Sequence, residues 1–240
     1  MYNYQKTLLS NGATNSKTAK NNIKKFILYI APHTMNNRGV NLCPKASKGC
    51  TIACLYSAGR GKFSNVQNAR INKANYYIND KMKFVNQLAS EIRKKIKTAR
   101  KKGEKIAFRL NGTSDLDFVY LLKKYANLDI ESLKDVAKFY DYTKILGKAI
   151  KYLKHPNYTV TFSRAEDNEK DTLKALKTGC NVAAVFNGSL PKKYKGYKVI
   201  NGDKTDLEML SYNNVILGLT AKGEAKKDTS GFVINTNLAF

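Results

Sequence analysis

The sequence predicts a single-domain α/β protein, built as a complete or partial (β/α) barrel with parallel strands. Short apolar runs alternate with amphipathic helical patterns along residues 23–240, which is typical of βαβ units. Seven or eight such runs in a chain of 240 residues favour a barrel over an open doubly wound sheet. No internal repeat or linker interrupts them, so we expect one domain after a polar N-terminal arm, residues 1–22.

The first part of the chain brings a strand, a cysteine-rich loop and a long helix. The apolar run 26–31 predicts a buried first strand. The cysteine loop, residues 43–61, follows this strand directly. Residues 64–102 lack Pro and Gly and repeat apolar residues at spacings of three and four, which predicts one amphipathic helix. Gly103 ends it.

Strands and helices then alternate to the end of the chain. Helices are predicted at residues 116–133, with a break near Asp129, and at 145–154 and 168–178. Strands are predicted at residues 105–110, 136–141, 158–162, 180–186, 197–200 and 215–219, with a last short one at 232–234.

Composition limits the partners and the surroundings of the protein. The formal net charge is +25, from 43 basic and 18 acidic residues, and such a field attracts polyanions, nucleic acid first. The alternative is a Lys- and Asn-rich composition whose lysines cover solvated helix faces. No apolar run is long enough to span a bilayer, and the N-terminus lacks the apolar segment of a signal peptide. We therefore expect a cytoplasmic protein with reduced thiols and no membrane partner.

Three of the four cysteines, Cys43, Cys50 and Cys54, lie within twelve residues. Clustered cysteines in a cytoplasmic protein bind metals more often than they form disulfides. Three thiolates can hold a metal or a [4Fe–4S] cluster and leave one coordination position open. The alternative is a set of reduced core thiols. His33 is a candidate fourth ligand, whereas we interpret Cys180 as a buried strand residue.

Polar residues follow nearly every predicted strand. In an α/β barrel the functional face is at the carboxyl ends of the strands. We expect these residues to surround the cysteine loop and to bind an anionic or zwitterionic small molecule, although each one alone also suits a turn or a helix cap. The candidate catalytic residues are Asp115, Asp141, Lys144 and Arg164, and the candidate cofactor-binding residues are Asn111, Thr113, Ser114, Ser163, Asn201 and Asp203.

Several stretches resemble the phage gene product 88-like proteins, over nearly the whole chain after residue 25. The resemblance implies a viral origin, and hence the cytoplasm of a host cell. The matching stretches are Leu42-Cys-Pro-Lys-Ala-Ser-Lys-Gly-Cys-Thr-Ile-Ala-Cys-Leu55, Arg109-Leu-Asn-Gly-Thr-Ser-Asp115, Tyr140-Asp-Tyr-Thr-Lys144, Val160-Thr-Phe-Ser163, Asn181-Val-Ala-Ala-Val-Phe186, Asn201-Gly-Asp203, Ala221-Lys-Gly and Asp228-Thr-Ser-Gly-Phe232.

In architecture the chain also resembles radical S-adenosylmethionine enzymes. Those enzymes place a three-cysteine loop after the first strand of a (β/α) barrel and hold a [4Fe–4S] cluster whose unique iron binds the cofactor. The spacing here is Cys-x6-Cys-x3-Cys, in place of their usual Cys-x3-Cys-x2-Cys. The resemblance implies S-adenosylmethionine as the candidate small molecule, bound among Ser163, Arg164, Asp115 and Asp203, in a radical or redox enzyme.

Two further hypotheses remain open. The first is a nucleic-acid-binding protein in which the three cysteines and a fourth ligand hold structural zinc, with the basic helical segment 81–105 along the phosphates. The second is a structural or host-takeover protein whose cluster only stiffens a loop.

Overall fold

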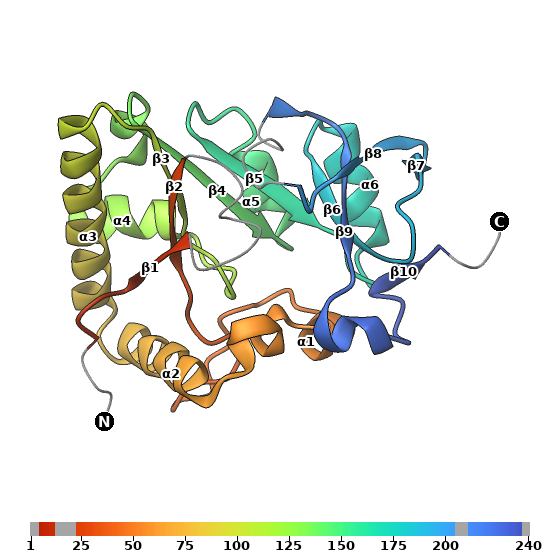
Figure 1. Cartoon of the computed structure of the whole chain (residues 1–240), viewed down its shortest axis with the longest axis horizontal. Coiled ribbons are helices and arrows are strands. Elements are labelled where there is room, and N and C mark those ends of the chain that lie inside the picture. The colour runs from red at the N-terminus through yellow and green to blue at the C-terminus, as the bar shows by residue number, and fades with distance from the viewer. Residues whose placement is uncertain (1–4, 13–22, 205–210, 237–240) are drawn as a thin grey trace. The chain divides into compact units, whose positions relative to one another are not determined.

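The computed structural model describes residues 5–12, 23–204 and 211–236 (Figure 1). These residues form two compact units. The chain passes between the units more than once, so they are not consecutive domains. The prediction of one domain over residues 23–240 stays a prediction, and most of the predicted arm lies outside the described residues. The first unit comprises residues up to 44, 63–141 and 155–158, and the second comprises 45–62, 142–154 and those from 159 onward.

The strands of the first unit form a mostly parallel sheet with an aromatic ladder across it. Residues Phe26, Phe108 and Phe139 face one another in register on three neighbouring strands. Their ring centroids are 5.6 and 5.0 Å apart, which adds to the stability of the pairing beyond buried area alone. In sheet order the strands are β1 (Leu9–Asn11), β2 (Lys24–Leu28), β3 (Ile106–Arg109) and β4 (Ala137–Thr143), with only β1 antiparallel to its neighbour.

Strand β1 lies in the segment that the sequence reading took for an irregular arm. The carboxylate of Glu91 accepts the backbone N–H groups of Leu8 and Leu9 at 2.8 and 3.0 Å. The ammonium of Lys73 donates to the Leu8 carbonyl at 2.8 Å, and Leu8 is fully buried. The expectation was wrong for residues 9–11, because the groups that hold them lie far away in sequence.

The single helix predicted over residues 64–102 is two helices, α2 (Ser64–Asn79) and α3 (Lys81–Lys101). Asp80 separates them, since its backbone leaves the helical region and its side chain accepts the N–H of Lys83 as an N-cap. The break predicted near Asp129 is confirmed: α4 (Phe118–Ala126) ends at a left-handed Asn127, and a 3-10 turn, η4 (Ile130–Leu133), follows.

The strands of the second unit lie in the order β5-β6-β9-β8-β7, and β10 pairs with β6. All pair in parallel except the β7–β8 hairpin, whose turn residues Lys195 and Gly196 both have positive φ, as a type I′ turn requires. Their bounds are β5 (Tyr158–Ser163), β6 (Val182–Asn187), β7 (Lys193–Tyr194), β8 (Tyr197–Asn201), β9 (Ile216–Thr220) and β10 (Val233–Asn235).

Short helices occupy what the sequence predicts as the cysteine loop. Cys50 lies in α1 (Lys48–Ile52), and Cys54 precedes the 3-10 turn η2 (Leu55–Ser57). The other helical elements of this unit are η3 (Gly59–Lys62), α5 (Leu146–Lys151), α6 (Glu169–Lys177) and η6 (Gly223–Lys227).

The α/β class is confirmed, but the described strands do not close into a barrel. Among them, β1 pairs only with β2 and β7 only with β8, so both are open edges. In a barrel each parallel strand pairs with the next one along the chain. Here β9 pairs with β6 instead, and β8 lies beyond it. None of the helices in the described ranges is long and apolar enough to cross a membrane.

Candidate functional site

The three cysteines proposed as ligands are divided between the units. Cys43 belongs to the first unit, and Cys50 and Cys54 belong to the second. All three are partly exposed, Cys180 is buried, and no disulfide joins any of these four described residues. Within the described residues, no group of three or more His, Cys, Asp or Glu side chains is arranged to hold a metal ion. Joint ligation of a cluster therefore stays a prediction.

Cys43 lies at the carboxyl ends of β2 and β3. Its sulfur accepts the backbone N–H of His33 at 3.5 Å, and its thiol donates to the carbonyl of Thr113 at 3.7 Å. Backbone N–H groups that point at a cysteine sulfur stabilise negative charge on it. Burial lowers the pKa of His33 below 6.5, so its imidazole is neutral at pH 7, the form that ligates metals.

A buried hydrogen-bond network fixes the loop that follows β3. Asn111 and Asp141 are each 2% exposed. Asp141 accepts the backbone N–H of Asn111 at 2.7 Å, its side-chain amide at 3.1 Å and the hydroxyl of Tyr158 at 3.0 Å. The Asn111 amide also donates to the Leu116 carbonyl and accepts from Ser114 and the Leu116 N–H, so all four of its hydrogen-bonding positions are used.

The structure thus gathers five predicted residues at the carboxyl ends of β3 and β4. Asn111 and Asp141 bond to each other and to their own loop, and their roles in cofactor binding and catalysis stay predictions. The Thr113 hydroxyl donates to the carbonyl of Ile30 at 2.6 Å, which holds the Thr113 carbonyl near Cys43. The five are Asn111, Thr113, Ser114, Asp115 and Asp141.

In the second unit, Glu166 anchors the helix that carries Cys50. Its carboxylate accepts the Ser47 hydroxyl and the Gly49 N–H, both at 2.7 Å, and Ser47 caps α1 by accepting the Cys50 N–H at 3.0 Å. Burial acts to raise the pKa of Glu166, but the hydrogen bonds from Ser47 and from backbone N–H groups outweigh it, and the pKa is lowered. The carboxylate is therefore ionised near neutral pH.

Gly49 allows α1 to approach the segment before β10 closely. A Cβ atom there would overlap the Ser230 hydroxyl and would lie 2.7 Å from Phe232 Cβ and 2.8 Å from a Glu166 oxygen. The partly buried Cys50 packs against the apolar cluster that contains Phe232. Only glycine fits this contact.

Two cations converge on Phe232. The Lys144 ammonium donates to the Ser163 hydroxyl at 3.1 Å and lies 5.3 Å from the centre of the Phe232 ring. The guanidinium of Arg164 donates to the carbonyls of Gly231 and Phe232. Three predicted residues, Lys144, Ser163 and Arg164, therefore gather at the carboxyl end of β5.

Asn201 and Asp203 lie in a loop at the carboxyl ends of β8 and β9. The Asp203 carboxylate accepts the Lys222 ammonium and the Thr220 N–H, both at 2.7 Å. The Asn201 side chain accepts the Asp203 N–H at 2.9 Å. These contacts close a turn and pair Lys222 with Asp203.

Sequence reasoning missed the residues that hold the site in place. Ser47, three residues before Cys50, carried the signal of an N-cap. Glu166 lies among the polar residues after β5, and no sequence signal distinguishes it from its neighbours. Phe232 and Tyr158 look like ordinary core residues in sequence, and only the fold reveals their partners.

A search of curated proteins and a search of solved structures found no match to this chain. A family model described as Gene product 88 matches residues 5–236. The match confirms the resemblance to the phage gene product 88-like proteins, and it spans nearly the whole chain, including both sets of strand-end loops. The chain belongs to the Gene product 88 family.

Proposed function

We propose that this protein is an iron–sulfur protein of the host-cell cytoplasm, in which Cys43, Cys50 and Cys54 ligate a [4Fe–4S] cluster. The observation that carries the proposal is the way two of the three partly exposed thiols, those of Cys43 and Cys50, are supported. Cys43 receives an N–H from His33, and the helix of Cys50 is held by Glu166. Both supports lie at the carboxyl ends of parallel strands, where α/β proteins bind their ligands.

Three thiolate ligands leave one iron open to a small molecule. S-adenosylmethionine is our candidate, because its amino and carboxylate groups can bind that iron. The chain's own contribution would be to bind and orient this molecule, with Lys144, Ser163 and Arg164 supplying cations and a hydroxyl, and with Asp115 and Asp203 among the candidate contacts. The cluster itself supplies one-electron chemistry, which makes a radical or redox reaction the expected class.

The first test is metal analysis of anaerobically purified and reconstituted protein. We expect iron and inorganic sulfide in equal amounts, with a broad visible absorption band. Single Cys→Ala variants at positions 43, 50 and 54 should each lose most of the iron. Cys180→Ala is the matched control, because Cys180 is buried and lies two residues before β6, and it should keep the iron. Protein that stays colourless and iron-free would overturn the proposal.

The same measurement separates the alternatives. Stoichiometric zinc in colourless protein, lost on Cys43→Ala, would favour the structural-zinc hypothesis. If Cys43→Ala left the fold intact but abolished an activity, a purely structural role for the cluster would be excluded.

The second test concerns the small molecule. Adding S-adenosylmethionine to the reduced protein should change the electron paramagnetic resonance spectrum of the cluster. Lys144→Gln should weaken this effect without lowering the iron content. An unchanged spectrum in iron-loaded protein would exclude S-adenosylmethionine and leave the cluster itself unaffected.

A further inference from the structure

Helix α3 carries most of its charge on one side. Its 21 residues include eight Lys or Arg and a single acidic residue, Glu91. The buried side is apolar and packs into the first unit through Phe84, Val85, Leu88, Ala89, Ile92, Ile96 and Ala99. Every cation on the opposite side faces solvent.

Some of these cations have local roles. Arg93 donates to the Ala126 carbonyl at 2.8 Å, Arg100 pairs with Asp135, and Lys95 lies 4.9 Å from the centre of the Phe26 ring. Lys81 lies 5.5 Å from the centre of the Tyr77 ring. Four exposed lysines, Lys83, Lys94, Lys97 and Lys101, lie on the side opposite the core, as the 100° turn per residue requires. We call these four the α3 lysine row.

The row has little acidic compensation. Within the described ranges, Lys94, Lys97 and Lys101 form no ion pair with any carboxylate. Glu91 is the acidic residue of the helix, and its carboxylate is occupied by the N–H groups of Leu8 and Leu9 and by the amide of Gln87. The field along the row is therefore positive.

A depression of about 330 Å³ lies at the N-terminal half of the row. Three lysines line it: Lys83 and Lys94 from the row, and Lys6 from the segment before β1. The exposed amide of Asn86 and the hydroxyl of Ser90 line it as well, together with Tyr76, Gln87 and Glu91. Ammonium, amide and hydroxyl groups together are the donors that proteins use for phosphate oxygens.

We propose that the α3 lysine row is a docking surface for the phosphate backbone of a duplex nucleic acid. From Lys83 to Lys101 the row spans about 27 Å of helix, and duplex DNA presents a charge about every 1.7 Å along its axis. Between the lysines the exposed residues are polar, namely Asn86, Ser90 and Thr98. The row therefore offers no aromatic ring on which the bases of a single strand could stack. This inference does not depend on the proposed cluster.

The test measures binding of labelled duplex DNA and duplex RNA over a range of salt concentrations. Wild-type protein should bind with a steep fall in affinity as salt rises. The variant Lys94→Gln/Lys97→Gln/Lys101→Gln removes three contacts and should lower the slope of log K against log salt by about 2.7, at about 0.9 per phosphate on DNA. Its affinity at low salt should fall at least about tenfold.

The matched control removes the same charge from α6. Lys170, Lys174 and Lys177 are exposed, and Lys170→Gln/Lys174→Gln/Lys177→Gln should bind like the wild type. Equal losses in both triple variants would show that overall charge, not this surface, binds the duplex, and would overturn the proposal. Tighter binding to single strands, or heparin binding that depends equally on the row, would also overturn it. Comparing the affinities for duplex DNA and duplex RNA then identifies which backbone the protein prefers.

Discussion

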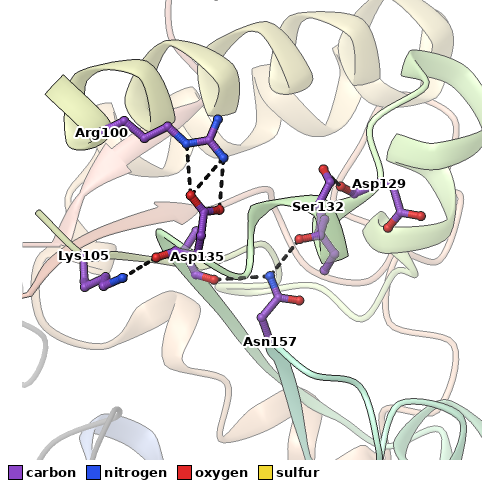
Figure 2. A network of polar contacts seen from close by, with 8 residues as sticks. Arg100, Lys105, Asp129, Ser132, Asp135 and Asn157 are labelled. Atoms are coloured by element: carbon purple, nitrogen blue, oxygen red, sulfur yellow. Dashed lines mark hydrogen bonds and ion pairs between the residues drawn. The ribbon is translucent and has the colours of Figure 1, made fainter. Parts of the chain in front are cut away.

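The segment that forms β4 carries a carboxylate at each end, and the two are held in opposite ways. Asp135 precedes the strand, and the Arg100 guanidinium faces it (Figure 2). The guanidinium nitrogens lie 3.0 to 3.2 Å from the Asp135 carboxylate oxygens. The two side chains of this pair are 51% and 58% exposed. Asp141, near the other end of the strand, accepts a similar number of hydrogen bonds but is 2% exposed.

Burial decides how much each carboxylate contributes to the stability of the fold. Water and salt replace the partners of an exposed ion pair at little cost. The groups that donate to Asp141 are buried, so water cannot take the place of its carboxylate. Loss of the carboxylate would leave these donors without a partner. Glu166 in the second unit lies between these cases, since it is partly exposed but accepts backbone and hydroxyl donors.

The largest expected effect is that of Asp141→Ala. It leaves the Asn111 N–H, the Asn111 amide and the Tyr158 hydroxyl without their acceptor, and should lower the free energy of unfolding by about 3–5 kcal/mol. Urea denaturation followed by circular dichroism measures this. Asp135→Ala is the control at the exposed end of β4. A similar loss in both variants would contradict the comparison.

The next effect tests the close approach of α1. Gly49→Ala pushes a methyl group into Ser230 and Phe232, and should lower the free energy of unfolding by about 1–3 kcal/mol, again in urea denaturation. Gly147→Ala, in α5, is the control, because its added Cβ meets nothing within 4 Å. That variant should be neutral or slightly stabilising.

Glu166 provides a pH test. Its folded pKa is lower than the ordinary value of 4.5, since hydrogen bonds from Ser47 and backbone N–H groups outweigh the opposing effect of burial. The ionised group therefore stabilises the fold fully above pH 4.5, and this contribution is lost as the pH falls through the folded pKa. Urea titrations at neutral pH and below pH 4.5 should show Glu166→Gln destabilised more at neutral pH than in acid. An equal difference at both would refute the assignment.

The smallest effect is expected for the Arg100–Asp135 pair. A double-mutant cycle with Ala at each position should give a coupling energy near the error of the measurement, and high salt should remove what remains. The same cycle for Asn111 and Asp141 should give a coupling of about 0.5–3 kcal/mol. If the exposed pair coupled as strongly as the buried one, burial would not be the deciding variable.

Sequence reading succeeded where the signal was local. Apolar runs identified the strands from β2 to β10 apart from the two-residue β7, because a buried parallel strand is apolar on both faces. The reading failed at Asp80, where apolar spacing continues across a residue that ends one helix and caps the next. It also failed at β1, whose stability depends on Glu91 and Lys73.

For the candidate site, too, local signals predicted some features and not others. The strand-end pattern predicted that polar residues from several strands would surround the cysteine loop, and that arrangement stays a prediction. The structure brings Asn111 to Ser114 and Asp141, and Lys144 to Ser163. The pattern could not reveal that Asn111 and Asp141 form hydrogen bonds with each other, because partners thirty residues apart produce no local pattern in the sequence.

The sequence by itself determined the α/β class, the spacing of the three cysteines, the excess of positive charge and the membership of the Gene product 88 family. Only the tertiary structure decided the open strand order, in which β9 pairs with β6, and the burial that separates Asp141 from Asp135. It also decided which lysines of α3 face solvent. The physical reason is that local patterns encode which face of an element is apolar, whereas strand order and burial depend on contacts between residues distant in the chain.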